Sequence, residues 1–163
     1  MNKLNHIAFV MDGNGRWGKK KGKSRNFGHL KGVETVKKIV RASIKLKIPI
    51  ITFYVFSSEN WKRPKNERSY LFKLIKNYFL KEINSIIKQG IKLNILGELN
   101  KFSLDLKSIL KKSINVTKKN KKIIVNLAIN YGSKKEIFQA FKKSKKNLTI
   151  KNFEKKSLYK KYA

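Results

Sequence analysis

Short apolar runs alternate along the chain with longer segments that carry apolar residues at helical spacing. The short runs are rich in β-branched and aromatic residues and are bounded by polar residues or proline, which is typical of buried strands. They predict strands over Ile7–Met11, Ile50–Phe56, Ile91–Leu96 and Ile123–Ile129. Apolar residues that recur every three or four positions predict helices over His29–Leu46, Pro64–Gln89 and Leu104–Val116, and one that opens at Glu136–Phe141.

Strands that alternate with helices predict an α/β fold, with a parallel sheet and helices on both faces. The 163 residues fit a single domain over residues 1–163, and the tail from Lys142 has only weak periodicity. Two polar segments, Asp12–Phe27 and Ser57–Lys65, each follow a strand and are expected to be loops. In a parallel sheet both would lie at the carboxyl edge of the strands, where ligands bind.

The net charge of +32 comes from 36 Lys and 5 Arg against 9 acidic residues. Such a charge would suit a polyanion, either nucleic acid or an anionic membrane. The lysines are scattered rather than gathered into one stripe, which favours a biased composition spread over solvated faces. Where lysine is the default cation, Arg16, Arg25 and Arg63 stand out for their planar, bidentate donors.

Several classes of protein and site are excluded or disfavoured by composition. The chain has no cysteine, which excludes disulfides, thiolate metal sites and cysteine nucleophiles. No stretch approaches the roughly 20 apolar residues of a membrane span. Met1–Asn5 leads directly into the first strand without the core of a signal peptide, so we expect a cytoplasmic protein.

The segment Asp12–Trp17 reads Asp-Gly-Asn-Gly-Arg-Trp and follows the first strand directly. A carboxylate at a strand end can bind a metal ion, glycines let backbone N–H groups approach phosphate oxygens, and arginine supplies a forked donor. Only two of the nine acidic residues are Asp, so composition alone does not account for this one. The segment predicts a site for a metal ion and a phosphorylated ligand.

Two known phosphate-binding patterns match this segment only in part. Gly13, Gly15 and Gly18 have the spacing of the dinucleotide-binding fingerprint, but the lysines after Gly18 are a poor helix start. No acidic residue ends the second strand directly, and the Walker A pattern lacks its final Ser or Thr. We expect neither motif to operate here.

The second polar segment reads Ser-Ser-Glu-Asn-Trp-Lys-Arg-Pro from Ser57 to Pro64. By itself it would be a capping turn before a long helix, with Trp61 as its apolar lid. Both strand-end segments carry Asn, Trp and Arg, so we expect them to share one site.

These residues resemble the cis-prenyltransferases, the family that contains undecaprenyl diphosphate synthase. The matching pieces are His6–Trp17, Arg25–His29, Phe56–Pro64 and Asn126–Gly132, in the family's order along essentially the whole chain. The resemblance implies an undecaprenyl diphosphate synthase-like fold. It also implies a transferase that condenses isopentenyl diphosphate onto an allylic diphosphate, commonly farnesyl diphosphate, with cis geometry. The product would be a polyprenyl diphosphate such as undecaprenyl diphosphate, the lipid carrier for cell-wall synthesis.

The resemblance assigns a role to each motif residue. Asp12 would bind Mg²⁺ and assist departure of diphosphate from the allylic substrate. Asn60 would serve the proton step, for which a neutral amide is better suited to positioning than to acting as a base. The residues that would hold the diphosphate are Gly13, Asn14, Gly15, Arg16, Arg25 and His29. The residues that would line the substrate site are Trp17, Ser57, Ser58, Glu59, Trp61 and Arg63.

A growing isoprenoid also needs an apolar tunnel, and its product would partition into a membrane. The side chains available for a tunnel are Val55, Leu71, Leu74, Ile75, Ile123 and Val125. On sequence alone, ordinary core packing is the favoured explanation of these six residues. The resemblance places the protein in the cytoplasm, at most peripheral on the inner face of the membrane.

The family pattern continues beyond this chain, with a segment of the form Arg-x-x-Gly-Glu-x-Arg-x-Ser-Asn-Phe that binds isopentenyl diphosphate and a further metal-site Glu. The last arginine here is Arg68, and Ser133-Lys134 follow Gly132 where the family usually has Gly-Arg. We therefore expect a C-terminally truncated chain that binds allylic diphosphate but condenses it poorly. An unpaired strand edge and an uncovered apolar face should also favour aggregation.

Three explanations of the truncation stay open: a second polypeptide that supplies the missing motif, a decaying gene, or a shortened version of a longer chain. The expected assembly is a homodimer or a hetero-complex. A basic nucleic-acid-binding module is the alternative from another class, and only the charge favours it. It predicts an affinity for DNA or RNA that falls steeply with salt.

Overall fold

Four parallel strands form the sheet, in the spatial order β1-β2-β4-β3. The computed structural model describes residues 4–144 and 149–157. The strands are β1 (His6–Val10), β2 (Ile50–Ser57), β3 (Ile91–Leu96) and β4 (Ile123–Tyr131). The predicted α/β class and the parallel sheet are confirmed.

The helices predicted from apolar periodicity are present as α2 (Arg25–Lys45), α3 (Lys65–Lys88), α4 (Leu104–Thr117) and α5 (Ser133–Ser144). Pro64 precedes the first residue of α3, where a missing N–H and a fixed φ cost nothing. Gly90 follows α3 with a left-handed φ of 69°. A short helix α6 (Ile150–Lys156) continues the tail, capped by the hydroxyl of Thr149, which accepts from the Asn152 N–H.

The prediction that these two polar segments are loops is wrong in part. Asp12–Phe27 contains α1 (Asn14–Lys20) and the start of α2, and Ser57–Lys65 contains a 3-10 helix, η1 (Ser58–Lys62). A helix therefore does begin inside the Gly13–Gly18 spacing, which removes that objection to the glycine fingerprint.

Close packing of α1 on α2 explains why a glycine- and lysine-rich segment is helical. A Cβ added to Gly28 would lie 1.9 Å from the carbonyl oxygen of Asn14, so the two backbones approach more closely than any side chain would allow. This tertiary contact outweighs the weak helix propensity of the segment. The contact joins residues of two different helices, so no local sequence pattern predicted it.

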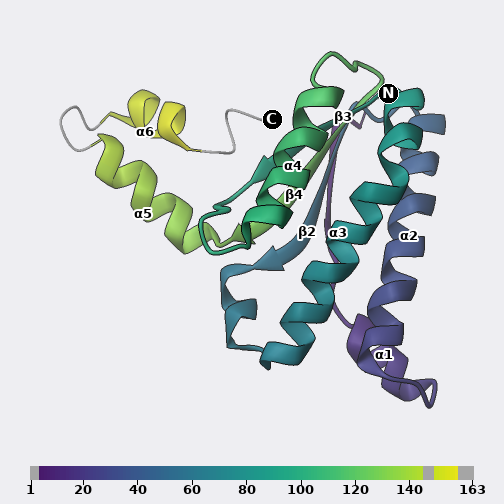
Figure 1. Cartoon of the computed structure of the whole chain (residues 1–163). Helices are drawn as coiled ribbons and strands as arrows, with labels where there is room; N and C mark the ends of the chain where they lie inside the picture. Colours follow the sequence, from purple (N-terminus) through teal and green to yellow (C-terminus); the bar gives the residue numbers. More distant parts are fainter. Residues whose placement is uncertain (1–3, 145–148, 158–163) are drawn as a thin grey trace.

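One face of the sheet forms the core with α2 and α3, which lie on the same side of it in Figure 1. The largest fully buried apolar side chains include Phe53, Ile51, Leu106 and Leu110. The end of α4 and the residues after it bond to the free edge of β3: the Thr117 hydroxyl accepts from the Leu93 N–H at 3.3 Å, and the Asn120 amide donates to the Ile91 carbonyl at 2.8 Å. That edge is therefore protected from pairing with another chain.

The opposite face of the sheet is exposed toward the ends of β1 and β2. Val10 is 78% exposed and its β2 neighbour Tyr54 is 38% exposed. Helices α5 and α6 extend away from the sheet beyond the carboxyl end of β4 (Figure 1). Within the described residues, β1 pairs with β2 alone and has an unpaired outer edge.

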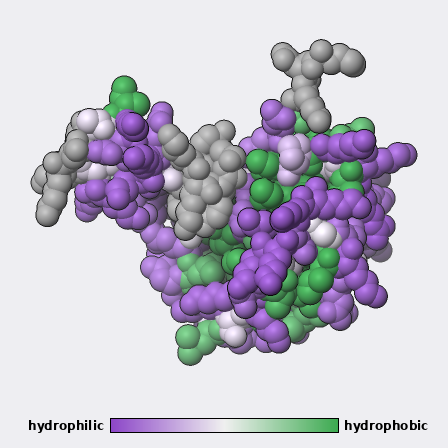
Figure 2. All heavy atoms as spheres, turned by 90° about the horizontal axis from the view of Figure 1, so that it is seen from above, coloured by the Kyte–Doolittle hydropathy of each residue, from purple (hydrophilic) through white to green (hydrophobic). Residues whose placement is uncertain are grey.

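Hydrophilic side chains cover most of the surface seen from above, with apolar patches between them (Figure 2). In the part of the chain that the structure describes, no helix combines the length and apolar character needed to cross a bilayer.

Candidate active site

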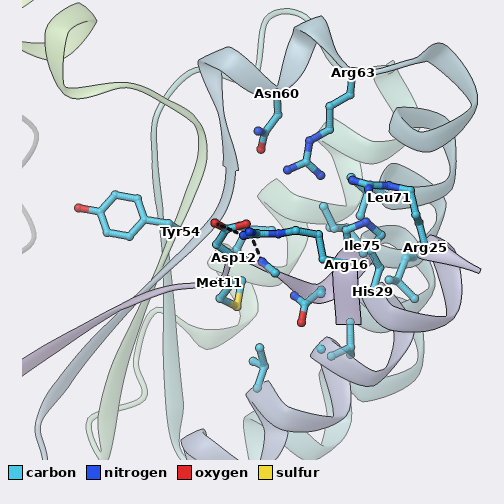
Figure 3. A pocket seen from close by; sticks show the side chains of 18 residues that line it. Met11, Asp12, Arg16, Arg25, His29, Tyr54, Asn60, Arg63, Leu71 and Ile75 are labelled. Carbon is cyan, nitrogen blue, oxygen red and sulfur yellow. Dashed lines mark hydrogen bonds and ion pairs between the residues drawn. The ribbon is translucent and has the colours of Figure 1, made fainter. Parts of the chain in front are cut away.

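A cavity of about 140 Å³ lies where the carboxyl ends of β1 and β2 meet α1, α2 and α3. Its mouth is polar and carries Asp12, Arg16, Arg25, His29, Asn60 and Arg63, most of which are labelled in Figure 3. Its depth is apolar and is lined by Val33, Val36, Val55, Leu71, Leu74 and Ile75. A ligand with a charged head and a hydrocarbon tail matches this division.

A second cavity of about 80 Å³, lined mainly by apolar side chains, shares Met11, Val33, Val36, Val55 and Ile75 with the first. It continues to Phe53, Leu127 and Ile129 on the covered sheet face and to Tyr78 and Phe79 of α3. Four of the six predicted tunnel residues, Val55, Leu71, Leu74 and Ile75, therefore line the first cavity. Ile123 and Val125 line neither of these cavities and belong to the buried core.

Asp12 follows β1 and forms an exposed ion pair with Arg16 one helical turn later, at 2.9 Å. Its carboxylate also accepts a hydrogen bond from the Gly13 N–H at 2.5 Å. These two interactions, the backbone one first, hold the pKa of Asp12 below its ordinary value. An exposed pair of this kind contributes little to stability. Both side chains are therefore available to a ligand or a cation.

The carboxylate of Glu67 joins two guanidinium groups and one imidazole of the cavity mouth. It accepts from Arg63 Nη1 at 3.1 Å and from Arg25 Nε and Nη2 at 3.2 and 3.3 Å, and it lies 3.3 Å from His29 Nε2. Its side chain is only 11% exposed. These contacts hold Arg63, which lies between η1 and α3, together with Arg25 and His29 of α2 on one side of the cavity.

The environment shifts the pKa of two members of this cluster. Burial lowers the pKa of His29 below 6.5, despite the opposing effect of Glu67. Burial alone would raise the pKa of Glu67, but hydrogen bonds from Arg25 and His29 outweigh it and hold that pKa below 4.5. At neutral pH the cluster thus has a carboxylate, two guanidinium groups and a neutral imidazole.

Sequence reasoning missed Glu67. One signal was available, because Glu67 lies four residues after Arg63, across the start of a predicted helix, and an i, i+4 pair of opposite charge is expected there. The contacts with Arg25 and His29 span about forty residues and had no sequence signal.

Gly15 has a spatial role that its sequence motif did not specify. A Cβ at this position would lie 3.0 Å from the central guanidinium carbon of Arg25. The missing side chain leaves Arg25 room to lie against α1 and reach Glu67. Gly13, Asn14 and Gly15 also line the cavity, as expected.

Asn60 and Arg63 reach the cavity mouth from η1 and the residue after it (Figure 3). The side-chain oxygen of Asn60 accepts from the Ser57 N–H at 3.1 Å, which closes the turn. With that oxygen engaged, the amide N–H₂ is the group left to a ligand. This arrangement favours a positioning role over that of a base.

Other predicted site residues lie outside the cavity. Ser57, Ser58, Glu59 and Trp61 do not line it, and Trp17 stacks on Phe27 beside a shallow depression on the outer side of α1. Trp61 packs among Phe56, Phe72 and Phe102. Their contact with substrate stays a prediction.

The residues at the mouth fit a divalent cation only in one mode. Among residues 4–144 and 149–157, no cluster of three His, Asp or Glu side chains could form a complete protein cage. Hard divalent cations are often held by one or two carboxylates together with ligand phosphates and water. Asp12 suits that mode, because it is exposed and lines the same cavity as the phosphate-binding candidates Arg16, Arg25, His29 and Arg63.

Comparison with known proteins gives one consistent family. Residues 10–162 match the family model described as "Putative undecaprenyl diphosphate synthase". The chain is 45% identical over 148 residues to the ditrans,polycis-undecaprenyl-diphosphate synthase ((2E,6E)-farnesyl-diphosphate specific) of Wigglesworthia glossinidia brevipalpis, covering 91% of this chain and 57% of that protein. It is 44% identical to an isoprenyl transferase of Prochlorococcus marinus, covering 84% and 50%. The chain spans about half the length of these curated relatives.

Solved structures agree with this result. A probable undecaprenyl diphosphate synthase from Campylobacter jejuni superposes with a TM-score of 0.79 at 29% identity, covering 96% of this chain and 70% of that one. Lavandulyl diphosphate synthase from Lavandula x intermedia, in complex with dimethylallyl diphosphate, has a TM-score of 0.89, covering 96% and 71%. Its 23% identity supports the fold alone.

Proposed function

Because the chain belongs to the undecaprenyl diphosphate synthase family of prenyltransferases, we propose that its cavity binds an allylic diphosphate, with farnesyl diphosphate as the substrate. The observation that carries this proposal is the convergence of Arg25, His29 and Arg63 at the mouth of an apolar cavity. The diphosphate would contact the cations, and the hydrocarbon chain would enter the cavity toward Val36 and Ile75. The charged and apolar halves of the ligand would each meet matching side chains.

In the proposed reaction, the C–O bond between the allylic carbon and the diphosphate breaks, and the bonding electrons leave with the diphosphate. Arg16, Arg25 and Arg63 would stabilise the charge that develops on the leaving group, because fixed donors need no reorganisation at that moment. Asp12 would hold Mg²⁺ against the same phosphates. When bound, the ion supplies charge neutralisation of the leaving group.

Condensation would then use the double bond of isopentenyl diphosphate, whose electron pair forms the new carbon–carbon bond while a proton is lost. Asn60 would orient this second substrate through its amide N–H₂ group, and the departing proton would pass to a phosphate oxygen. The product would be a polyprenyl diphosphate such as undecaprenyl diphosphate, which partitions into a membrane. A homodimer or a complex with a second polypeptide is the assembly that we propose.

Calorimetric titration of the purified chain with farnesyl diphosphate and Mg²⁺ tests the binding step. We expect saturable binding that Arg25→Ala and Arg63→Ala each weaken about tenfold or more, since a charge-assisted hydrogen bond contributes roughly 1.5–3 kcal/mol. Arg41→Ala is the matched control, because Arg41 is an exposed arginine of α2 outside the cavity. Absence of binding, or an equal effect of Arg41→Ala, would overturn the proposal. Labelled isopentenyl diphosphate added to the same mixture tests condensation.

A further inference from the structure

Asn130, near the end of β4, connects two segments that are far apart in the sequence. Its side-chain oxygen accepts a hydrogen bond from Trp61 Nε1 at 2.8 Å, and its side-chain nitrogen donates to the Glu98 carbonyl oxygen at 2.9 Å. The residue is 3% exposed. One buried amide thus joins η1 to the connection between β3 and α4.

The backbone at Asn130 is left-handed, with φ of 52°. Among non-glycine residues asparagine tolerates this conformation best, and few others offer both an acceptor and a donor on a short side chain. The position therefore needs two properties at once. A glycine there would keep the backbone but lose both hydrogen bonds.

Trp61 is the part of η1 that Asn130 holds, and it is firmly packed. Its ring centroid lies 5.4 Å from those of Phe56 and Phe102 and 5.6 Å from that of Phe72. Its carbonyl oxygen accepts from Arg68 Nη1 at 3.0 Å. The ring has no free N–H to offer a ligand, since Asn130 accepts it.

Two candidate ligand-binding side chains flank this anchored tryptophan. Asn60 precedes Trp61 directly, Arg63 follows two residues later, and both point toward the cavity mouth in Figure 3. The turn between them is short and contains Trp61, so the packing of Trp61 restrains the backbone from which both side chains extend. A shift of about 1 Å at a site residue is enough to lower activity strongly.

We propose that Asn130 is a positioning residue that, through Trp61, holds Asn60 and Arg63 at the mouth of the cavity. Asn130 does not line either apolar-walled cavity. The inference rests on the proposed function, because the placement of Arg63 affects binding only if the cavity takes a diphosphate. Glu98, the second partner of Asn130, is itself held in place, because its carboxylate accepts hydrogen bonds from Lys135 and Gln139 of α5.

Two substitutions break the link from opposite ends. Asn130→Gly keeps the left-handed backbone and removes both hydrogen bonds, and Trp61→Phe keeps an aromatic ring and removes the N–H. We expect each to weaken binding of pyrophosphate with Mg²⁺ by about tenfold, the value of one well-placed buried hydrogen bond. Asn130→Asp keeps the acceptor for Trp61 and should retain more affinity than Asn130→Gly.

A double-mutant cycle separates positioning from a general loss of stability. The double variant Asn130→Gly/Trp61→Phe should bind no more weakly than either single variant, and Arg63→Ala should cost less affinity in the Asn130→Gly background than in the unmutated chain. Additive effects, or an unchanged affinity in both single variants, would overturn the proposal. Lys47→Gly is the control, because Lys47 is the other left-handed non-glycine residue described, with φ of 56°, and lies away from the cavity.

A readout without ligand keeps this inference distinct from the proposed function. In a Trp17→Phe background, Trp61 is the only tryptophan. Asn130→Gly should then make Trp61 fluorescence more accessible to acrylamide, whereas Lys47→Gly should leave it unchanged. If the unmutated chain binds neither pyrophosphate nor farnesyl diphosphate, the proposed function fails, and the quenching result still decides whether Asn130 orders Trp61. Unchanged quenching counts against the inference.

Discussion

Glu67 Oε1 lies 3.1 Å from Nη1 of Arg63, one helical turn earlier, across the start of α3. The same carboxylate also contacts Arg25 and His29, so a single buried anion lies among the cations of the cavity mouth. Without it, two guanidinium groups would face each other with no compensating charge. Glu67 therefore stabilises the arrangement that a diphosphate would use.

Replacement of Glu67 by Gln should lower the free energy of unfolding by roughly 1–2 kcal/mol, because it weakens charge-assisted hydrogen bonds to Arg25 and Arg63, whose side chains are 42% and 32% exposed. Pyrophosphate should restore more of this loss than it adds to the unmutated chain, since the ligand supplies the missing negative charge. Thermal unfolding with and without pyrophosphate measures both effects. Glu34→Gln, which breaks an exposed pair with Lys31 on α2, is the control and should change little.

Protonation of the same cluster should destabilise the protein as the pH falls. The pKa values of His29 and Glu67 lie below 6.5 and 4.5 in the folded chain, so the unfolded chain takes up more protons below each of those values. The contribution of His29 to the free energy of unfolding is fully present above about pH 6.5, and that of Glu67 above about pH 4.5. Urea unfolding from pH 7.5 to 4 should show the decline, and His29→Gln should flatten its upper part. Identical pH profiles would contradict this assignment.

Asp12→Asn should remove the dependence of diphosphate binding on Mg²⁺ and leave the fold intact. The Asp12 side chain is 72% exposed, and its ion pair with Arg16 is of a kind that contributes at most about 1 kcal/mol. Titration of pyrophosphate with and without Mg²⁺ measures the change. We expect a large metal-dependent gain in affinity for the unmutated chain and almost none for the variant. A variant that keeps the full gain would show that Asp12 is not the metal ligand.

Filling the apolar cavity should distinguish binding of the hydrocarbon chain from binding of the diphosphate. Val36 lines both cavities, so Val36→Phe should weaken binding of farnesyl diphosphate and leave that of pyrophosphate unchanged. An overpacked site typically costs about 1–3 kcal/mol. Paired calorimetric titrations make the comparison. Equal losses for both ligands would indicate a distorted fold rather than a blocked cavity.

Gly28→Ala should destabilise the packing of α1 on α2 severely, because the new methyl group would lie 1.9 Å from the Asn14 carbonyl oxygen. The helices must separate, and the loss should exceed about 3 kcal/mol, as in the larger effects seen for core substitutions. Gly22→Ala is the comparison: no atom lies within 4 Å, and only the left-handed φ of 67° opposes it. Its cost should stay near 1–2 kcal/mol. Chemical denaturation of both variants gives the two values.

Strands and long helices were predictable because their signals are local. The apolar run of β3 and the helical stripe of α4 each record burial on a single element, so periodicity located them closely. The first polar segment was predicted less well. Whether Asn14–Lys20 is helical depends on Gly28, which lies fourteen residues after its contact Asn14, and on the space that its missing side chain leaves.

The residues of the candidate site likewise fall into those that the sequence could predict and those that it could not. Asp12, Arg16 and Arg63 could be chosen from the sequence because rare residue types follow strand ends, and the parallel sheet brings those ends to one edge. The sequence offered only the pairing of Glu67 with Arg63. The contact of Glu67 with Arg25 and that of Asn130 with Trp61 could not be predicted, because these partners are about forty and seventy residues away. Trp61 was expected to line the substrate site, which stays a prediction, and only the structure showed that its N–H donates to Asn130.

The sequence by itself determined the class of fold, the polar edge and the chemistry of the donors at Asp12–Arg16, since each depends on residue types within a short span. Only the tertiary structure decided how those donors are arranged. Burial of one carboxylate among Arg25, His29 and Arg63, and closure of an apolar cavity beneath them, require helices from distant parts of the chain to meet. Electrostatic compensation and packing are properties of that meeting in space, so no single stretch of the sequence specifies them.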